Sequence, residues 1–150
     1  MKIESIVQSA QEFHDAKRAA LNLLYTHNML TEGLSSLLKK YDLSGEQFNV
    51  LRILRGAGQK PANMGMIQQR MIAKTSNTTR LVDKLLAKDL VMRKVCPDNR
   101  RKMEVWITSK GLKLLDIVDP LVDQFEADFF DRLSNDELIH LIQLLEKIRT

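Results

Sequence analysis

The residues that decide the fold run from Lys74 to Gly111, in the stretch KTSNTTRLVDKLLAKDLVMRKVCPDNRRKMEVWITSKG. The stretch holds ten lysine and arginine residues against four acidic residues, an excess of six positive charges. The whole chain of 150 residues carries a formal net charge of only +4. Positive charge is therefore concentrated in one short segment, which is typical of a surface that binds a polyanion.

The first part of the stretch has the periodicity of an amphipathic helix that begins at Ser76. At about 100° per residue, one face collects residues that can pack and the other presents short polar side chains and an arginine. The packing face holds Thr78, Leu81, Val82 and Leu85, and the polar face holds Ser76, Thr79, Arg80 and Asp83. Small side chains and a guanidinium suit the base edges of a DNA major groove. An ordinary surface helix would show the same pattern, so the helix alone leaves both interpretations open.

The second part of the stretch, from Leu90 to Ile107, alternates with the two-residue period of β-strands. The two expected strands flank residues 96–102, CPDNRRK, in which proline, aspartate and asparagine favour a turn. Arg100, Arg101 and Lys102 follow one another at the tip of this hairpin. Like charges repel, so folding explains these adjacent cations poorly. Neutralisation by the phosphates of a nucleic-acid groove explains them better.

Signals for helix starts surround this stretch. Asn63 is the expected N-cap of a short helix from Met64 to Ile72, and about four residues of turn follow it. Two short helices at this spacing, the second with a polar outer face, form a helix-turn-helix. Three further starts are expected from Ser44-x-x-Gln47, from Thr108 and from Ser134-x-x-Glu137, the first and last being capping boxes.

Composition is that of one globular domain, with 44% hydrophobic and 28% charged residues. No apolar run approaches the ~20 residues that span a bilayer, and Glu4 and Glu12 interrupt any signal-peptide core. We therefore expect no membrane association and a cytoplasmic location. The single Cys96 can form neither an internal disulfide nor a thiolate metal cage. No catalytic arrangement, glycine-rich phosphate loop or histidine pair at ligand spacing is present, so we expect no enzyme, no cofactor and no metal.

A set of residues in the hairpin and the preceding helix forms a recognisable signature. Asp98-x-Arg100 at the tip is followed by Val105, Ile107, Thr108 and Gly111, and residues 79–93 read TRLVDKLLAKDLVMR. These residues resemble the D-x-R…L-T-x-x-G signature, recognition helix and first wing strand of the MarR family of bacterial winged-helix regulators. The similarity extends from about Leu21 to Arg149. Asp89 stands where the family usually has glycine, so it would need to adopt a left-handed conformation.

The resemblance implies a single domain of mainly α class with a small β-hairpin wing. Its winged helix-turn-helix lobe would span about 44–111, and dimerisation helices would span about 1–40 and 112–150. It implies a homodimer that binds a pseudo-palindromic operator in double-stranded DNA. The residues agree, because residues 111–150 carry nine acids against four bases and are striped with apolar side chains. These terminal helices have more hydrophobic surface than one small winged-helix core can cover.

The resemblance also implies roles for individual residues. Arg100 would be the wing arginine in the minor groove, and Asp98 would orient it or pair with a nearby arginine. The complete set of expected DNA contacts is Ser76, Asn77, Thr79, Arg80, Lys84, Asp98, Asn99, Arg100, Arg101 and Lys102.

We further expect a repressor that a small-molecule effector releases from DNA. Tyr25 and His27 are candidates for lining an effector pocket between the dimerisation helices and the DNA lobe, although packing is the favoured interpretation for both. Two alternative functions stay open. The winged helix could hold a protein partner, or the protein could be a thiol-based redox sensor that depends on Cys96.

Overall fold

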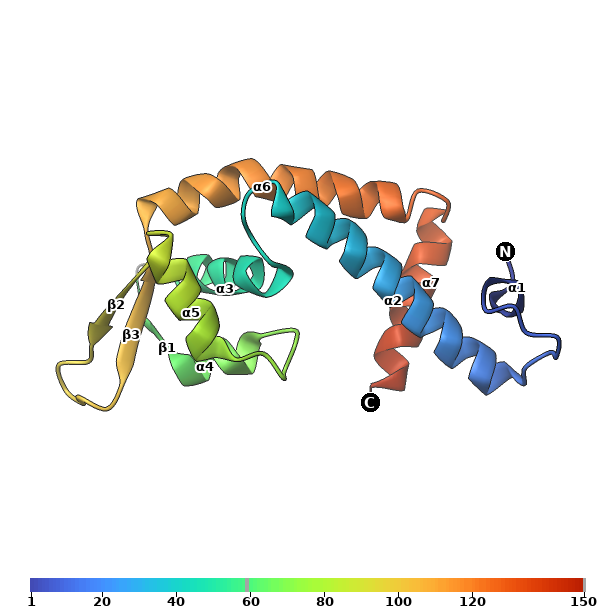
Figure 1. Ribbon diagram of the computed structural model, residues 1–150, viewed down its shortest axis with the longest axis horizontal. Coiled ribbons are helices and arrows are strands. Elements are labelled where there is room, and N and C mark those ends of the chain that lie inside the picture. The colour runs from blue at the N-terminus through green and yellow to red at the C-terminus, as the bar shows by residue number, and fades with distance from the viewer. Residues whose placement is uncertain (59, 150) are drawn as a thin grey trace.

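The chain has a lobe of short helices and strands at one end and longer helices that project from it (Figure 1). The computed structural model describes residues 1–58 and 60–149. Its elements are α1 (Ile3–Ile6), α2 (Asp15–Lys39), α3 (Gly45–Gly56), β1 (Ala62–Asn63), α4 (Met64–Arg70), α5 (Thr78–Ala87), β2 (Val91–Val95), β3 (Met103–Ile107), α6 (Ser109–Phe129) and α7 (Asn135–Ile148). The predicted fold class, mainly helical with a small wing, is confirmed.

Local side chains fix the starts of the helices. The Ser44 hydroxyl accepts a hydrogen bond from the Gln47 N–H at 3.1 Å, and the Gln47 side chain accepts one from the Ser44 N–H at 3.3 Å. Ser134 and Glu137 form the second predicted capping box at the start of α7. These reciprocal bonds satisfy donors that the first helical turn leaves free.

The sheet has three strands among the described residues, one more than the sequence predicted. β3 lies in the centre, antiparallel to β2 and to the short β1, with Ala62 opposite Val105. Ala62 is fully buried in this position. A two-residue strand is too short to show the alternation by which strands are recognised, so only the pairing with β3 defines it.

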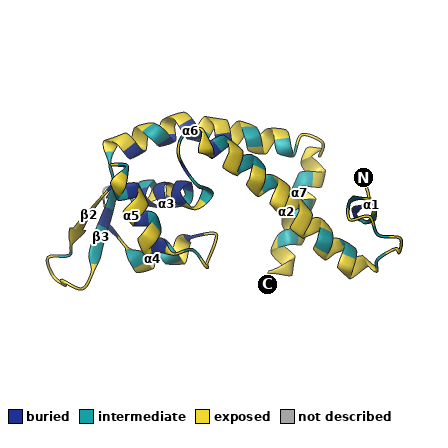
Figure 2. Cartoon of the chain, viewed as in Figure 1, coloured by how far each residue is buried: buried dark blue, intermediate teal, exposed yellow. Residues whose placement is uncertain are grey.

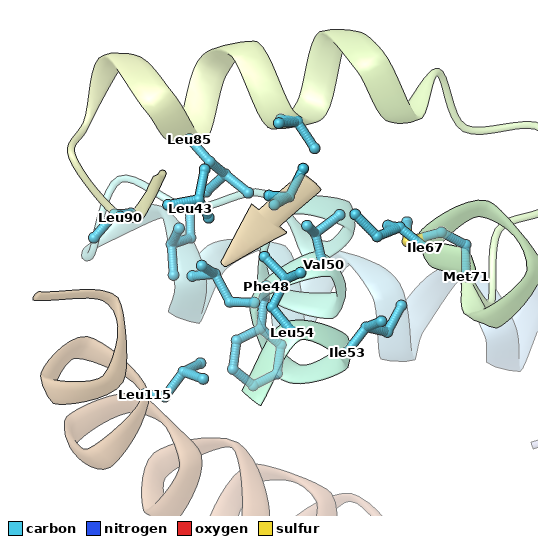
Figure 3. Close-up of a cluster of buried hydrophobic side chains, with 14 of the residues drawn as sticks. Leu43, Phe48, Val50, Ile53, Leu54, Ile67, Met71, Leu85, Leu90 and Leu115 are labelled. Atoms are coloured by element: carbon cyan, nitrogen blue, oxygen red, sulfur yellow. The ribbon is translucent and has the colours of Figure 1, made fainter. Parts of the chain in front are cut away.

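The hydrophobic core of the lobe gathers around α3 (Figure 3). Val50, Leu51 and Leu54 of α3 are almost completely buried, and they meet side chains from α4, α5, the sheet and the first half of α6. Burial of each such side chain contributes about 1.5–3 kcal/mol. This core holds α5 and the wing in a fixed relation to α6.

The projecting helices bury far less of their apolar surface. α7 has no buried residue, and Ile139 and Ile142 on it are about half exposed (Figure 2). Leu23 and Leu24 of α2 are exposed to a similar degree. None of the described helices is both long enough and apolar enough to cross a membrane.

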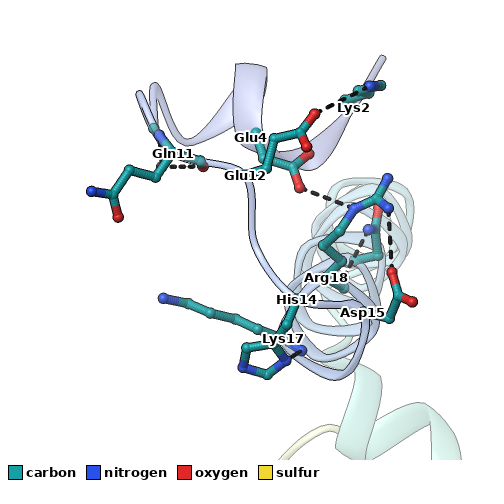
Figure 4. A network of polar contacts seen from close by, with 10 residues as sticks. Lys2, Glu4, Gln11, Glu12, His14, Asp15, Lys17 and Arg18 are labelled. Carbon is teal, nitrogen blue, oxygen red and sulfur yellow. Dashed lines mark hydrogen bonds and ion pairs between the residues drawn. The ribbon is translucent and has the colours of Figure 1, made fainter.

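The short N-terminal helix is held against α2 by a polar network (Figure 4). The Arg18 Nε lies 3.0 Å from the Glu4 Oε1, and the Arg18 Nη1 lies 3.6 Å from the Asp15 carboxylate. Ile3 of α1 is almost completely buried. The chain before α2 is thereby folded back onto the projecting end of that helix.

Candidate nucleic-acid interface

The helix with the polar outer face, α5, begins two residues later than predicted. The Asn77 Oδ1 accepts a hydrogen bond from the Arg80 N–H at 3.1 Å, which makes Asn77 the N-cap and leaves Ser76 in the preceding turn. Asparagine is a preferred N-cap because its side chain satisfies a free N–H of the first turn. Ser76 is therefore a turn residue next to the helix and not its first residue.

The preceding helix, α4, ends at Arg70 and not at Ile72 as predicted. Met71 is extended, and the Ile72 N–H donates to the Asn49 side chain of α3 at 3.0 Å. This bond to another helix competes with continuation of α4. The turn between α4 and α5 consequently spans residues 71–77, which is longer than the expected four or so residues.

A buried polar contact sets the relation between α4 and α5. The Thr78 hydroxyl hydrogen-bonds the Gln68 side-chain oxygen, and the Gln68 amide donates to the Lys74 carbonyl at 2.7 Å. Thr78 is only 5% exposed. Thr78 lies on the packing face, as predicted, whereas the role of Gln68 was not predicted because it depends on two segments ten residues apart.

The two faces of α5 divide as predicted. Val82 and Leu85 are completely buried, whereas Thr79, Arg80 and Asp83 are exposed. Lys84 is also exposed, but it lies one turn farther from the N-terminal end of α5. The short polar side chains and Arg80 therefore form an open surface at the beginning of this helix.

The wing tip is a loop closed by its own backbone. The Cys96 N–H donates to the Lys102 carbonyl at 2.9 Å, and the Lys102 N–H donates to the Asn99 carbonyl at 2.9 Å. The Asn99 Oδ1 accepts from the Arg101 N–H at 3.1 Å, so Asn99 also shapes the turn. Arg100, Arg101 and Lys102 are all exposed, and within residues 1–58 and 60–149 none of them forms an ion pair. Three uncompensated cations thus stand on a closed loop.

Carboxylate pairing occurs at the base of the wing and not at its tip. The Arg93 Nη1 lies 2.8 Å from the Asp83 Oδ1, which ties β2 to α5. In the part of the chain that the structure describes, Asp98 contacts no arginine side chain, so the pairing implied by the resemblance is not formed here. Arg93 is engaged in fixing the wing, whereas Arg100 is free.

A tight corner joins α5, β2 and α6. Asp89 has a φ of 58°, so it adopts the left-handed conformation expected of it. The Thr108 hydroxyl donates to the Asp89 carbonyl at 2.7 Å, and the Lys110 Nζ donates to the Lys88 carbonyl at 2.8 Å. These bonds dock the start of α6 on the end of α5, which orients the wing relative to the polar face.

The structure brings the two predicted parts of the interface to one side of the lobe. In Figure 1 the N-terminal end of α5 and the wing tip both lie at the lower side of the view, away from α6. Tyr25 and His27, for which packing was the favoured interpretation, are instead exposed on the projecting part of α2 in the single chain. No group of three histidine, cysteine, aspartate or glutamate residues that could hold a metal occurs in the described ranges.

Comparison with known proteins identifies this arrangement. Residues 43–103 match the model of the MarR family. A MarR transcription factor from Planctomyces limnophilus, whose crystal structure is known, is 32% identical to this chain with a TM-score of 0.72, covering 91% of this chain and 98% of that one. The chain belongs to the MarR family. The transcriptional regulator HosA of Escherichia coli O111:H- is 31% identical over 111 residues, which cover 71% of this chain and 78% of HosA.

The same fold occurs in a MarR protein whose crystal structure was determined in complex with DNA. A mutant of MarR from E. coli, complexed with operator DNA, has a TM-score of 0.79 at 22% identity, covering 93% of this chain and 99% of that one. At this identity the likeness concerns the fold alone. The Planctomyces limnophilus protein is a transcription factor, and HosA is a transcriptional regulator.

Proposed function

We propose that this MarR protein regulates transcription in the cytoplasm by binding specific sites in double-stranded DNA as a homodimer. The observation that carries the proposal is the pairing of an exposed polar helix start with three uncompensated cations on the neighbouring wing. The first feature suits the edges of bases in a major groove, and the second suits phosphates and a minor groove.

Each part of the interface would have its own role. Arg80 would form hydrogen bonds with base edges, and the small Thr79 would allow the helix to approach the DNA closely. Ser76 and Asn77 would contact the phosphate backbone of the DNA at the start of the helix. The Asn77 oxygen is used as the N-cap, so its NH2 group would be the donor to DNA. Arg100, Arg101 and Lys102 would neutralise phosphates, with Asn99 holding the loop in shape.

The homodimer is supported by apolar surface that the single chain leaves open. α7 carries an apolar stripe without a buried residue, and the projecting part of α2 exposes Leu23 and Leu24. Soluble monomers rarely expose such contiguous apolar surface. A second copy would cover both stripes and would place two recognition helices about one turn of DNA apart, as a pseudo-palindromic operator requires.

The proposal includes repression that a small molecule relieves. A dimer that spans about two turns of a promoter would exclude other proteins from it, and a ligand that changes the angle between the lobes would weaken binding. A reporter gene downstream of the identified operator would test the direction of regulation, because deletion of a repressor raises expression and deletion of an activator lowers it.

DNA binding is tested by selecting duplexes from a random pool and measuring affinity by fluorescence anisotropy at several salt concentrations. If each subunit neutralises about four phosphates, log K against log salt should have a slope near −7. Arg100→Ala should weaken binding to every sequence, whereas Arg80→Ala should also change the preferred bases. Lys113→Ala, which removes a cation from the exposed side of α6, is the control and should change neither. A slope near zero would refute the proposal and favour a protein partner.

A further inference from the structure

Three lysines line a hollow beside the C-terminal half of α5, away from the wing and from the N-terminal end of that helix. The hollow has a volume of about 370 Å³ and lies between the end of α2, the turn into α3 and the C-terminal half of α5. Its polar lining includes Ser35, Lys39, Asp42, Gln47, Lys84 and Lys88. We call it the lysine hollow.

The spacing of these residues explains why they share one space. Ser35 and Lys39 are four residues apart on α2, and Lys84 of α5 is four residues before Lys88, the C-cap of that helix, so each pair lies on one side of its helix. Lysines four residues apart repel each other, and the facing Lys39 adds to the repulsion. A cation near the C-terminal end of a helix stabilises that helix through its dipole, and this effect acts on α2 and α5 separately. That effect does not account for their orientation toward a common hollow.

The protein itself compensates only one of the three charges. The Lys88 Nζ lies 3.3 Å from the Asp42 carboxylate and 3.2 Å from the Gln47 Oε1, and it also donates to the Asp42 carbonyl. Asp42 has a φ of 54° because it ends α2 in a Schellman motif, in which the Leu43 N–H donates to the Leu38 carbonyl at 3.1 Å. Lys88 is therefore a structural clamp between α5 and the α2–α3 turn.

The other polar groups of the lysine hollow are left with free donors. Across residues 1–58 and 60–149, Lys39 and Lys84 form no ion pair and the Ser35 hydroxyl forms no hydrogen bond. The clamp leaves two exposed cations, Lys39 and Lys84, and the exposed Ser35 hydroxyl on the lining of the lysine hollow, which is larger than a single ion. A tetrahedral dianion can accept from all three groups at once, whereas a lone carboxylate offers fewer acceptors and less charge.

We propose that the lysine hollow binds a small phosphate-bearing ligand, held by Lys39, Lys84 and Ser35. Such a ligand would connect the C-terminal end of α2 to the C-terminal half of α5. It would restrain the recognition helix relative to the projecting helices while leaving Arg80 and the wing free. The hollow is in the size range of small-molecule sites, so it has room for more than the phosphate group.

The test is calorimetric titration of the full chain with inorganic pyrophosphate at constant ionic strength and without DNA. Wild type should bind with a Kd below about 1 mM, equivalent to about −4 kcal/mol. The double variant Lys39→Gln with Lys84→Gln should bind at least tenfold more weakly. The matched control is Lys40→Gln with Lys113→Gln, which removes the same charge from exposed residues outside the hollow. The control should bind like wild type.

Amide shifts in NMR spectra would locate the ligand. Shifts confined to residues 35–47 and 84–88 support the proposal. Shifts at Arg100 and Arg101, together with wild-type affinity in the Lys39→Gln, Lys84→Gln variant, would mean that pyrophosphate binds the wing. This result would overturn the proposal. Equal weakening in both double variants would also overturn it, because only general charge would then matter. DNA is absent from the experiment, so a negative result leaves the proposed regulatory function untouched.

Discussion

Replacing Gly111 by alanine should destabilise the protein, because the start of α6 packs against backbone there. A Cβ at this position would lie 2.4 Å from the Leu90 carbonyl oxygen and 2.7 Å from the Ile107 Cγ1, although real Cβ contacts are essentially never under 3.0 Å. The Leu90 carbonyl also accepts the Thr108 N–H at 3.1 Å, so any relief of the clash disturbs this bond. Overpacking costs about 1–3 kcal/mol and the disturbed hydrogen bond about 1 kcal/mol. Alanine regains about 1 kcal/mol of helix propensity.

The expected net loss for Gly111→Ala is therefore about 1–3 kcal/mol in the free energy of unfolding. Urea denaturation at one fixed protein concentration measures it, since the stability of a dimer depends on concentration. Gly56→Ala is the matched control, because a Cβ there meets no atom within 4 Å. The control should be neutral or more stable by up to about 1 kcal/mol. If both variants unfold at the same urea concentration, the packing argument for Gly111 is wrong.

Deletion of residues 134–150 removes α7 and should yield monomer or aggregate in light scattering; a truncated chain that stays dimeric and binds its operator would contradict the proposed interface. Cys96→Ser should keep operator affinity, since Cys96 closes the wing through its backbone N–H; a peroxide-induced loss of affinity in wild type only, reversed by dithiol, would instead establish a redox role. Hydrogen bonds from the Ser134 N–H and hydroxyl lower the pKa of Glu137. The ionised carboxylate therefore stabilises the folded state above pH 4.5, and this stabilisation is lost as the pH falls through the lowered pKa of Glu137. Glu137→Gln should therefore lose less stability than wild type on acidification below pH 4.5, and identical pH profiles would exclude this role.

The amino-acid sequence by itself determined the features that depend on near neighbours in the chain. Capping at Ser44, Thr108 and Ser134 was predicted correctly because each cap involves residues three positions apart. The two faces of α5 followed from helical periodicity, and the exposed cations of the wing followed from charge density. Caps between near neighbours and burial of one helix face can be recognised in the sequence, because they require particular residue types at fixed spacings.

Only the tertiary structure decided the features that depend on distant segments. The strand β1 exists because Ala62 pairs with Val105, and α4 ends early because Asn49 of another helix binds the Ile72 N–H. The lysine hollow joins α2 to α5 across more than forty residues, as the bond between Lys88 and Asp42 shows. Each strand, helix end or lysine has several compatible partners in the sequence. Packing of the core brings only one of these partners within reach, so the tertiary structure decides the pairing.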